Sequence, residues 1–181
     1  MILKMKKLKY YLFSIILITF AGCGATGQIP EEKSIPTTPE LEKVIDGDTF
    51  TIKTGEKIRV ASIDTPEMYG ENNIREAYSM QAYYRTKELL ENSNFELRKL
   101  SSRDKDPYNR LLRNVYIINE NKYLSEILVK EGLARVYYDT SLPLNHLLEL
   151  CSFEKQAQKF QKNIWEAKSR GYFERKSPKC P

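Results

Sequence analysis

Histidine is almost absent from this 181-residue sequence, because His146 is the only one. Zinc sites built from several histidines, and nucleases whose metal is held by histidines, are therefore excluded. A Ser-His-Asp triad would depend on His146 alone. Two aspartate motifs also fall short: "DGDTF" misses the D-x-D-x-T spacing of aspartyl-phosphate phosphatases by one position, and "DTP" is not the D-T-G of aspartic proteases.

A hydrophobic run long enough to span a membrane comfortably is also lacking, and the nearest is "LFSIILITFAG" at residues 12–22. Four lysines and no acidic residue precede it, and Cys23 follows directly, which is the layout of a secretory signal peptide. The stretch "FAGC" resembles a bacterial lipobox, in which the cysteine receives lipid. We therefore expect an exported protein with a signal peptide at 1–22 and a lipid anchor to the cell membrane at Cys23. The alternatives are an uncleaved anchor and ordinary secretory cleavage.

Strong charge of one sign is missing once this leader is set aside. The net charge of +5 falls to +1 without the four leader lysines, so most of the basicity belongs to the targeting signal. Residues 23–40 are rich in Gly, Pro and Thr and predict a flexible tether. The remaining body is weakly basic, which is compatible with a polyanionic ligand and does not require one.

Cysteine is scarce, with three in the chain. If Cys23 carries lipid, Cys151 and Cys180 remain as an even pair in a chain sent to an oxidising compartment. They form either a disulfide that ties the C-terminal tail to the last helix or two free thiols.

The body alternates between short strand patterns and helical patterns. Alternation predicts strands at 41–44, 50–53, 57–63, 95–100 and 113–118, with a short extended segment at 133–138. Helical spacing appears at 76–92, at 123–132 ending on Gly132, and after Pro143 to about Trp165. Five short strands with helices between and after them predict an α+β fold, a small barrel with about three packed helices, rather than a doubly wound parallel sheet.

Two acidic motifs are candidates for a metal site. In "VIDGDTF", Asp46 and Asp48 flank a glycine, which by itself favours a simple hairpin turn. In "RVASIDTPE", Asp64, Thr65 and Glu67 follow an apolar strand. Together with Asp48 they form an all-oxygen set that suits Ca²⁺ or Mg²⁺, with an affinity of about 10⁻⁴ to 10⁻³ M.

Two arginines are further candidates: Arg59 lies in the apolar strand before Asp64, and Arg110 lies in "RDKDPYNRLLRN". Such arginines usually lie solvated on the surface, but their forked donors also match phosphate oxygens. Strict alternation along the strand places Arg59 and Asp64 on opposite faces, so both serve one site only if a bulge intervenes or Asp64 lies beyond the regular strand.

Five stretches resemble, in order and spacing, the staphylococcal nuclease (thermonuclease) family. They are "VIDGDTF", "IRVASIDTPE", "DPYNRLLRNVYI", "LVKEGLARVYY" and "KNIW". The resemblance covers roughly residues 41–165 and implies a five-stranded oligonucleotide-binding (OB-fold) barrel with helices. It also implies Ca²⁺-dependent cleavage of DNA and RNA that leaves 3′-phosphate ends.

The resemblance assigns roles to individual residues. Asp48 and Asp64 would be direct calcium ligands, with the Thr65 carbonyl as a third and Asp46 behind them. Glu67 would act on the attacking water, while Arg59 and Arg110 would bind the phosphate. Tyr108 and Tyr138 would line the nucleotide pocket, which departs from the family at Pro107, Asn109 and Thr140.

The resulting expectation is a monomer with four parts: signal peptide 1–22, tether 23–40, nuclease domain 41–166 and C-terminal tail 167–181. Two rival functions stay open. One is a noncatalytic barrel that binds nucleic acid or a protein partner. The other is a phosphatase or phosphodiesterase of small nucleotides, which the altered pocket residues favour.

Overall fold

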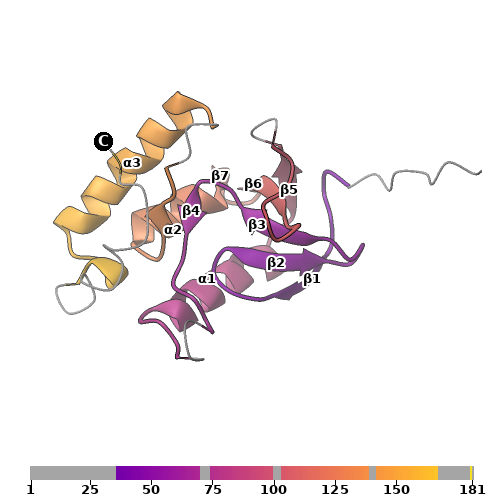
Figure 1. Ribbon diagram of the computed structural model, residues 1–181, viewed down its shortest axis with the longest axis horizontal. Helices are drawn as coiled ribbons and strands as arrows, with labels where there is room; N and C mark the ends of the chain where they lie inside the picture. Colours follow the sequence, from indigo (N-terminus) through magenta and orange to yellow (C-terminus); the bar gives the residue numbers. More distant parts are fainter. Residues whose placement is uncertain (1–35, 70–73, 100–102, 139–141, 167–179, 181) are drawn as a thin grey trace, which may run out of the picture. The chain divides into compact units, whose positions relative to one another are not determined.

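Five strands form a mixed sheet in the order β1-β2-β3-β6-β5, with the short strand β7 beside β6 (Figure 1). The first three strands pair antiparallel in succession, β6 runs parallel to β3, and β5 runs antiparallel to β6. The computed structural model describes residues 36–69, 74–99, 103–138, 142–166 and 180. The bounds are Leu41–Val44 (β1), Thr49–Ile52 (β2), Lys57–Val60 (β3), Phe95–Arg98 (β5), Leu111–Ile117 (β6) and Lys122–Tyr123 (β7).

The sheet curls until its two ends approach each other. The backbone N–H of Leu97, on β5, donates to the carbonyl of Thr37, just before β1, at 2.8 Å. The Lys53 N–H likewise donates to the Glu40 carbonyl at 2.9 Å. Residues 37–40 therefore belong to the folded unit, whereas the sequence predicts a tether through residue 40. The predicted signal peptide and Cys23 lie outside the described residues.

The prediction of a single strand at 57–63 is wrong, because strand β3 ends at Val60. Ser62 has a positive φ of 70°, and a new strand, β4 (Ile63–Asp64), starts after it. This strand pairs antiparallel with β8 (Arg135–Val136) in a separate two-stranded sheet. The positive φ is uncommon for serine, so nothing in the local sequence marked the break.

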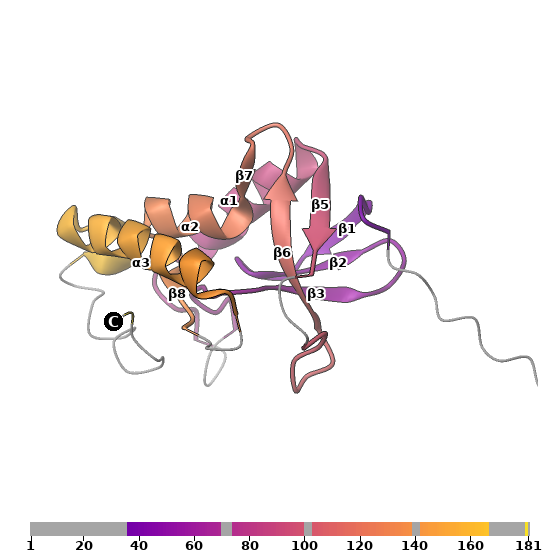
Figure 2. The same ribbon diagram turned by 90° about the horizontal axis from the view of Figure 1, so that it is seen from above.

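The described residues form three α-helices: α1 (Ser79–Glu91) and α2 (Leu124–Glu131) pack against the sheet, and α3 (Leu144–Lys159) packs against α2 and β8. The end of α2 at Gly132, with φ 71°, is as predicted. The predicted last helix to Trp165 is too long, because Gln161 has a φ of 50° and a separate 3-10 helix, η2, spans Asn163–Trp165. In Figures 1 and 2, α2 and α3 lie side by side. No helix in the described ranges is long and apolar enough to cross a membrane.

The core is built from the inward faces of the strands and the apolar faces of the helices. Its largest members, all fully buried, include Phe50, Ile58, Ile117, Leu128 and Leu147. The prediction of an α+β fold with an OB-type curled sheet and three helices is confirmed.

Cys151, on α3, is joined to Cys180 by a disulfide, with the two Cα atoms 5.6 Å apart. Of the two alternatives that the sequence leaves open, the structure contains the cross-link between α3 and the C-terminal residues. Such a bond stabilises a fold mainly by restricting the unfolded chain.

Candidate active site

The turn between β1 and β2 is pressed against helix α1. Asp46 Oδ1 accepts the Asp48 N–H at 3.0 Å, which holds the turn. The Thr86 hydroxyl, on α1, donates to the Gly47 carbonyl at 2.6 Å. A Cβ on Gly47 would lie 2.7 Å from the Cβ of Ala82, so only glycine fits between turn and helix. The "DG" pair therefore makes a turn and also fixes the direction of Asp48.

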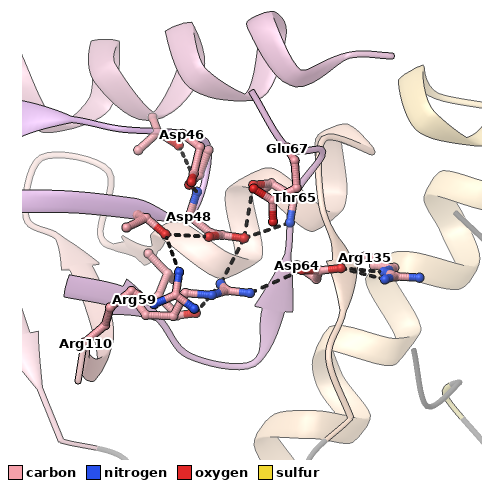
Figure 3. A network of polar contacts seen from close by, with 12 residues as sticks. Asp46, Asp48, Arg59, Asp64, Thr65, Glu67, Arg110 and Arg135 are labelled. Atoms are coloured by element: carbon pink, nitrogen blue, oxygen red, sulfur yellow. Dashed lines mark hydrogen bonds and ion pairs between the residues drawn. The ribbon is translucent and has the colours of Figure 1, made fainter. Parts of the chain in front are cut away.

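Asp48 is the centre of the site and is 4% exposed (Figure 3). Its Oδ2 accepts the Thr65 N–H at 2.8 Å and the Thr65 hydroxyl at 3.0 Å. Its Oδ1 accepts the Thr49 hydroxyl at 3.0 Å. The resemblance implied only a carbonyl contribution from Thr65, whereas its amide and hydroxyl orient the aspartate.

Arg59 bridges the two acidic motifs. Its Nη1 lies 2.9 Å from Asp48 Oδ2, and its Nη2 lies 3.3 Å from Asp64 Oδ1 (Figure 3). The break at Ser62 resolves the conflict with strict alternation, because Asp64 sits on a new strand and turns toward Arg59. The Arg59 guanidinium therefore offsets part of the negative charge of two carboxylates, one from each acidic motif.

Arg135 was missed by sequence reasoning, although it contacts Asp64 from the other side. Its Nε and Nη2 lie 3.0 Å and 2.6 Å from Asp64 Oδ2. The register of β4 and β8 places the two residues directly opposite each other. The available signal was a basic residue inside the apolar stretch "LARVYY".

Glu67 is exposed, and its backbone is fixed by a second missed residue, Glu76. The Glu67 N–H donates to Glu76 Oε2 at 3.0 Å, and the Glu76 N–H donates to the Glu67 carbonyl at 3.1 Å. Although the residue as a whole is exposed, neighbouring protein displaces water from its carboxyl group, and this desolvation, followed by the charges of Asp48 and Asp64, raises the pKa of Glu67. A raised pKa makes this carboxylate a better proton acceptor.

Arg110 is presented by a turn that Asp106 organises. The Asp106 carboxylate accepts the backbone N–H groups of Tyr108 and Arg110, each at 2.9 Å, and the Arg110 Nε at 2.6 Å. Asn109 takes a φ of 63°, as its tolerance of left-handed geometry allows. Arg110 Nη1 donates to the Thr49 hydroxyl at 3.1 Å, and that hydroxyl donates to Asp48. Arg110 therefore joins the same network through one intervening side chain.

A cavity of about 300 Å³ opens beside both arginines. Tyr108 and Tyr137 are among its lining residues, together with Arg103. The resemblance pointed to Tyr138, but in the described part of the chain Tyr137 lines this cavity and Tyr138 packs against the core. Adjacent residues of an extended segment face opposite ways, so one of the two had to turn inward. Thr140 lies outside the described residues.

The site carries a surplus of acidic groups. Burial and then the charge of Asp48 raise the pKa of Asp46 to about 8. Carboxyl groups that share a small volume resist simultaneous ionisation, and a cation removes that penalty. This surplus is the feature of the structure that fits a bound metal.

The donors fit a hard divalent cation in chemistry, but they are not gathered into a ready cage. No three acidic, histidine or cysteine side chains converge on one point within the described ranges. The residues that would hold the ion are Asp48 and Asp64, with the Thr65 carbonyl, and all of these donors are oxygen. Both carboxylates form ion pairs with arginines instead, so a bound cation would have to replace at least one arginine contact of each carboxylate.

Replacing Asp46 by asparagine is expected to stabilise the metal-free protein increasingly from about pH 4 to pH 8. In this window the folded state keeps a proton on Asp46 that the unfolded state has lost, so wild-type stability falls as pH rises. Asparagine does not titrate, and its Oδ1 can still accept the Asp48 N–H. The gain at pH 7 is at most about 4 kcal/mol, at about 1.4 kcal/mol per pKa unit. Urea unfolding in chelator across this range measures it, and parallel pH profiles for the two proteins would contradict it.

Comparison with known proteins places these residues in a wider context. Residues 57–167 match the family described as "Staphylococcal nuclease homologue". The chain is 36% identical to the thermonuclease of Staphylococcus hyicus over 132 residues, covering 71% of this chain and 75% of that protein. It is 38% identical to the thermonuclease of Staphylococcus intermedius over 130 residues, covering 70% and 74%.

A third relative, endonuclease YncB of Bacillus subtilis, is 34% identical over 128 residues. That match covers 69% of this chain and 60% of YncB, so the chain spans less than two thirds of that relative's length.

Proposed function

Because the chain belongs to the staphylococcal nuclease family, we propose that it is an endonuclease that hydrolyses phosphodiester bonds of DNA and RNA. In this proposal Ca²⁺ assists the reaction and the products carry 3′-phosphate ends. One observation carries it: Arg59 contacts both Asp48 and Asp64, and Arg110 joins them through Thr49. Two cationic forks and the acidic groups thus lie together beside a cavity.

Each of these side chains has a definite task in such a reaction. Glu67 would take a proton from the attacking water, which its raised pKa favours. The water oxygen forms a bond to phosphorus, the bond from phosphorus to the 5′-oxygen breaks, and the departing 5′-oxygen takes a proton from solvent water. Arg59 and Arg110 would donate hydrogen bonds to the phosphate oxygens as their charge grows. A bound Ca²⁺, held by Asp48 and Asp64, would supply further neutralisation of that charge.

The cavity supports broad substrate choice. Tyr108 and Tyr137 are 81% and 44% exposed, so their rings are available to stack on bases. Stacking and phosphate contacts do not read base edges, and they are compatible with cleavage of many sequences.

Removing the metal is expected to abolish cleavage. Purified protein is mixed with plasmid DNA or RNA in Ca²⁺ or in chelator, and we expect at least about 10²-fold slower cleavage in chelator, the scale of a lost electrostatic stabiliser. Fragments that a polymerase extends only after phosphatase treatment would show 3′-phosphate ends. Full cleavage in chelator would contradict the metal's role. Binding without cleavage in all conditions would select the noncatalytic barrel.

A phosphodiesterase of small nucleotides is the second candidate, and the small volume of the cavity, about 300 Å³, favours it. Faster hydrolysis of dinucleotides than of plasmid DNA, compared at equal concentrations of phosphodiester bonds, would select this candidate.

We also propose that the protein is exported and held at the cell membrane by lipid on Cys23, as a monomer. The leader and the cysteine after it support this, and the Cys151–Cys180 disulfide suits an oxidising compartment. When cells are grown with labelled palmitate, we expect the wild-type protein to incorporate the label and Cys23→Ala not to. In detergent phase separation, we expect the wild-type protein to enter the detergent phase. Unlabelled wild-type protein in the medium would contradict the anchor, and a dimer in size-exclusion chromatography of the detergent-solubilised protein would contradict the monomer.

A further inference from the structure

Asp64 is held by guanidinium groups on both of its oxygens. Arg59 donates to Oδ1, and Arg135 donates to Oδ2 with two of its nitrogens (Figure 3). A carboxylate has about four lone-pair positions, and three of them are engaged here. Arg59 is shared with Asp48, and Arg135 pairs with Asp64 from the opposite side of the carboxylate.

Arg135 has little freedom to leave this position. Its side chain is 7% exposed. Backbone hydrogen bonds also hold strand β8, both to helix α3 and to the segment before β4. The Val136 N–H donates to the buried Glu154 carboxyl, on α3, at 2.8 Å. The Tyr137 N–H donates to the Ser62 carbonyl, beside β4, at 2.8 Å. The backbone that carries Arg135 is therefore tied to the backbone that carries Asp64.

We propose that Arg135 is a positioning residue that acts as the internal counter-ion of Asp64 and weakens the binding of the divalent cation. The proposal rests on the proposed function, because it takes Asp64 as a ligand of that cation. A cation at Asp64 would compete with Arg135 for Oδ2 and would be repelled by a positive charge held a few ångströms away. Like charges at such distances interact strongly in a partly buried site.

This arrangement sets the calcium concentration at which the site fills. With little Ca²⁺ present, the two arginines neutralise Asp64 and the site persists without metal. At higher concentrations the ion takes over the carboxylate oxygens. The chain would thereby respond to the millimolar calcium found outside cells and remain unloaded at lower concentrations.

Calorimetric titration of the chelator-treated full chain with Ca²⁺ tests the proposal without using activity. We expect Arg135→Gln to bind Ca²⁺ about tenfold more tightly than the wild type, because it removes the competing charge. Arg85→Gln is the matched control, since Arg85 pairs with Glu131 and Glu88; we expect its affinity to equal that of the wild type. Unchanged or weaker binding by Arg135→Gln, with a wild type that binds, would overturn this inference alone. A wild type that binds no Ca²⁺ would overturn the proposed metal site and the inference together.

A second variant keeps the test valid if Arg135→Gln does not fold. Arg135→Lys retains the charge but loses the forked pair of donors, so we expect Ca²⁺ binding a few times tighter than in the wild type. Circular dichroism melts of each variant in chelator establish that it is folded before titration. If Arg135→Lys binds Ca²⁺ with an affinity equal to or below that of the wild type, Arg135 does not compete with the cation for Asp64.

Discussion

Replacing Arg59 by alanine is expected to lower kcat/KM for DNA cleavage about 10³-fold. The substitution removes a cation that lies 2.9 Å from Asp48 and 3.3 Å from Asp64, and it removes the proposed donor to the phosphate. Loss of one preorganised donor to a developing negative charge costs about 10² to 10³ in rate. The two aspartates would also repel each other more strongly, which adds to the loss in the absence of metal.

Single-turnover cleavage of a labelled oligonucleotide measures this effect without product release. Arg113→Ala is the control, because Arg113 is also largely buried and pairs with Asp104. We expect it to lose stability and to keep most of its activity. Arg59→Lys separates charge from geometry, since lysine cannot reach both aspartates with a planar fork. If Arg59→Ala folds and cleaves within tenfold of the wild type, Arg59 has no direct part in the reaction.

Replacing Gly47 by alanine is expected to destabilise the protein by about 2 to 3 kcal/mol, the upper range for overpacking a filled interior. The added Cβ would lie 2.7 Å from Ala82 Cβ and 2.8 Å from the Thr65 hydroxyl oxygen. The turn or helix α1 must move, and Thr65 orients Asp48. We therefore expect cleavage to fall with stability, even when the variant is assayed well below its melting temperature.

Gly55→Ala provides the comparison. Gly55 has a φ of 96° and no atom within 4 Å of an added Cβ, so its substitution adds backbone strain without a clash. We expect a cost of about 1 kcal/mol and unchanged cleavage. Urea unfolding curves and cleavage rates for both variants separate the two effects. Equal losses in the two variants would show that the close contact of Gly47 with α1 is unimportant.

Local pattern was sufficient to predict much of the fold. Alternation located the strands around Phe50, Ile58 and Val115 to within a few residues, and Gly132 marked the end of α2. The break after Val60 was not predictable, because an apolar run continues through it and Ser62 is not a residue that announces a positive φ. The predicted start of helix α1 at residue 76 was wrong for a similar reason. Tyr78 takes a φ of 66°, and the helix begins at Ser79.

The site was predictable where its members lie in short motifs. Asp48, Asp64 and Arg59 are brought together as the motifs indicated. The contact between Asp64 and Arg135 spans 71 residues and depends on the pairing of two-residue strands, which no local pattern encodes. The choice between Tyr137 and Tyr138 depends on which face of an irregular segment meets the cavity. Glu76 was missed because its task is to hold a backbone amide, for which many polar residues would qualify.

The interruption at Ala61 and Ser62 makes the number of residues between Arg59 and Asp64 critical for the site. Side chains alternate along extended chain, so deleting one residue here would point Ile63 at Arg59 and send Asp64 to the opposite side. Asparagine or glycine at position 62 could adopt the same backbone angles without that consequence. We therefore expect substitutions of Ser62 to be tolerated more easily than an insertion or deletion between β3 and β4.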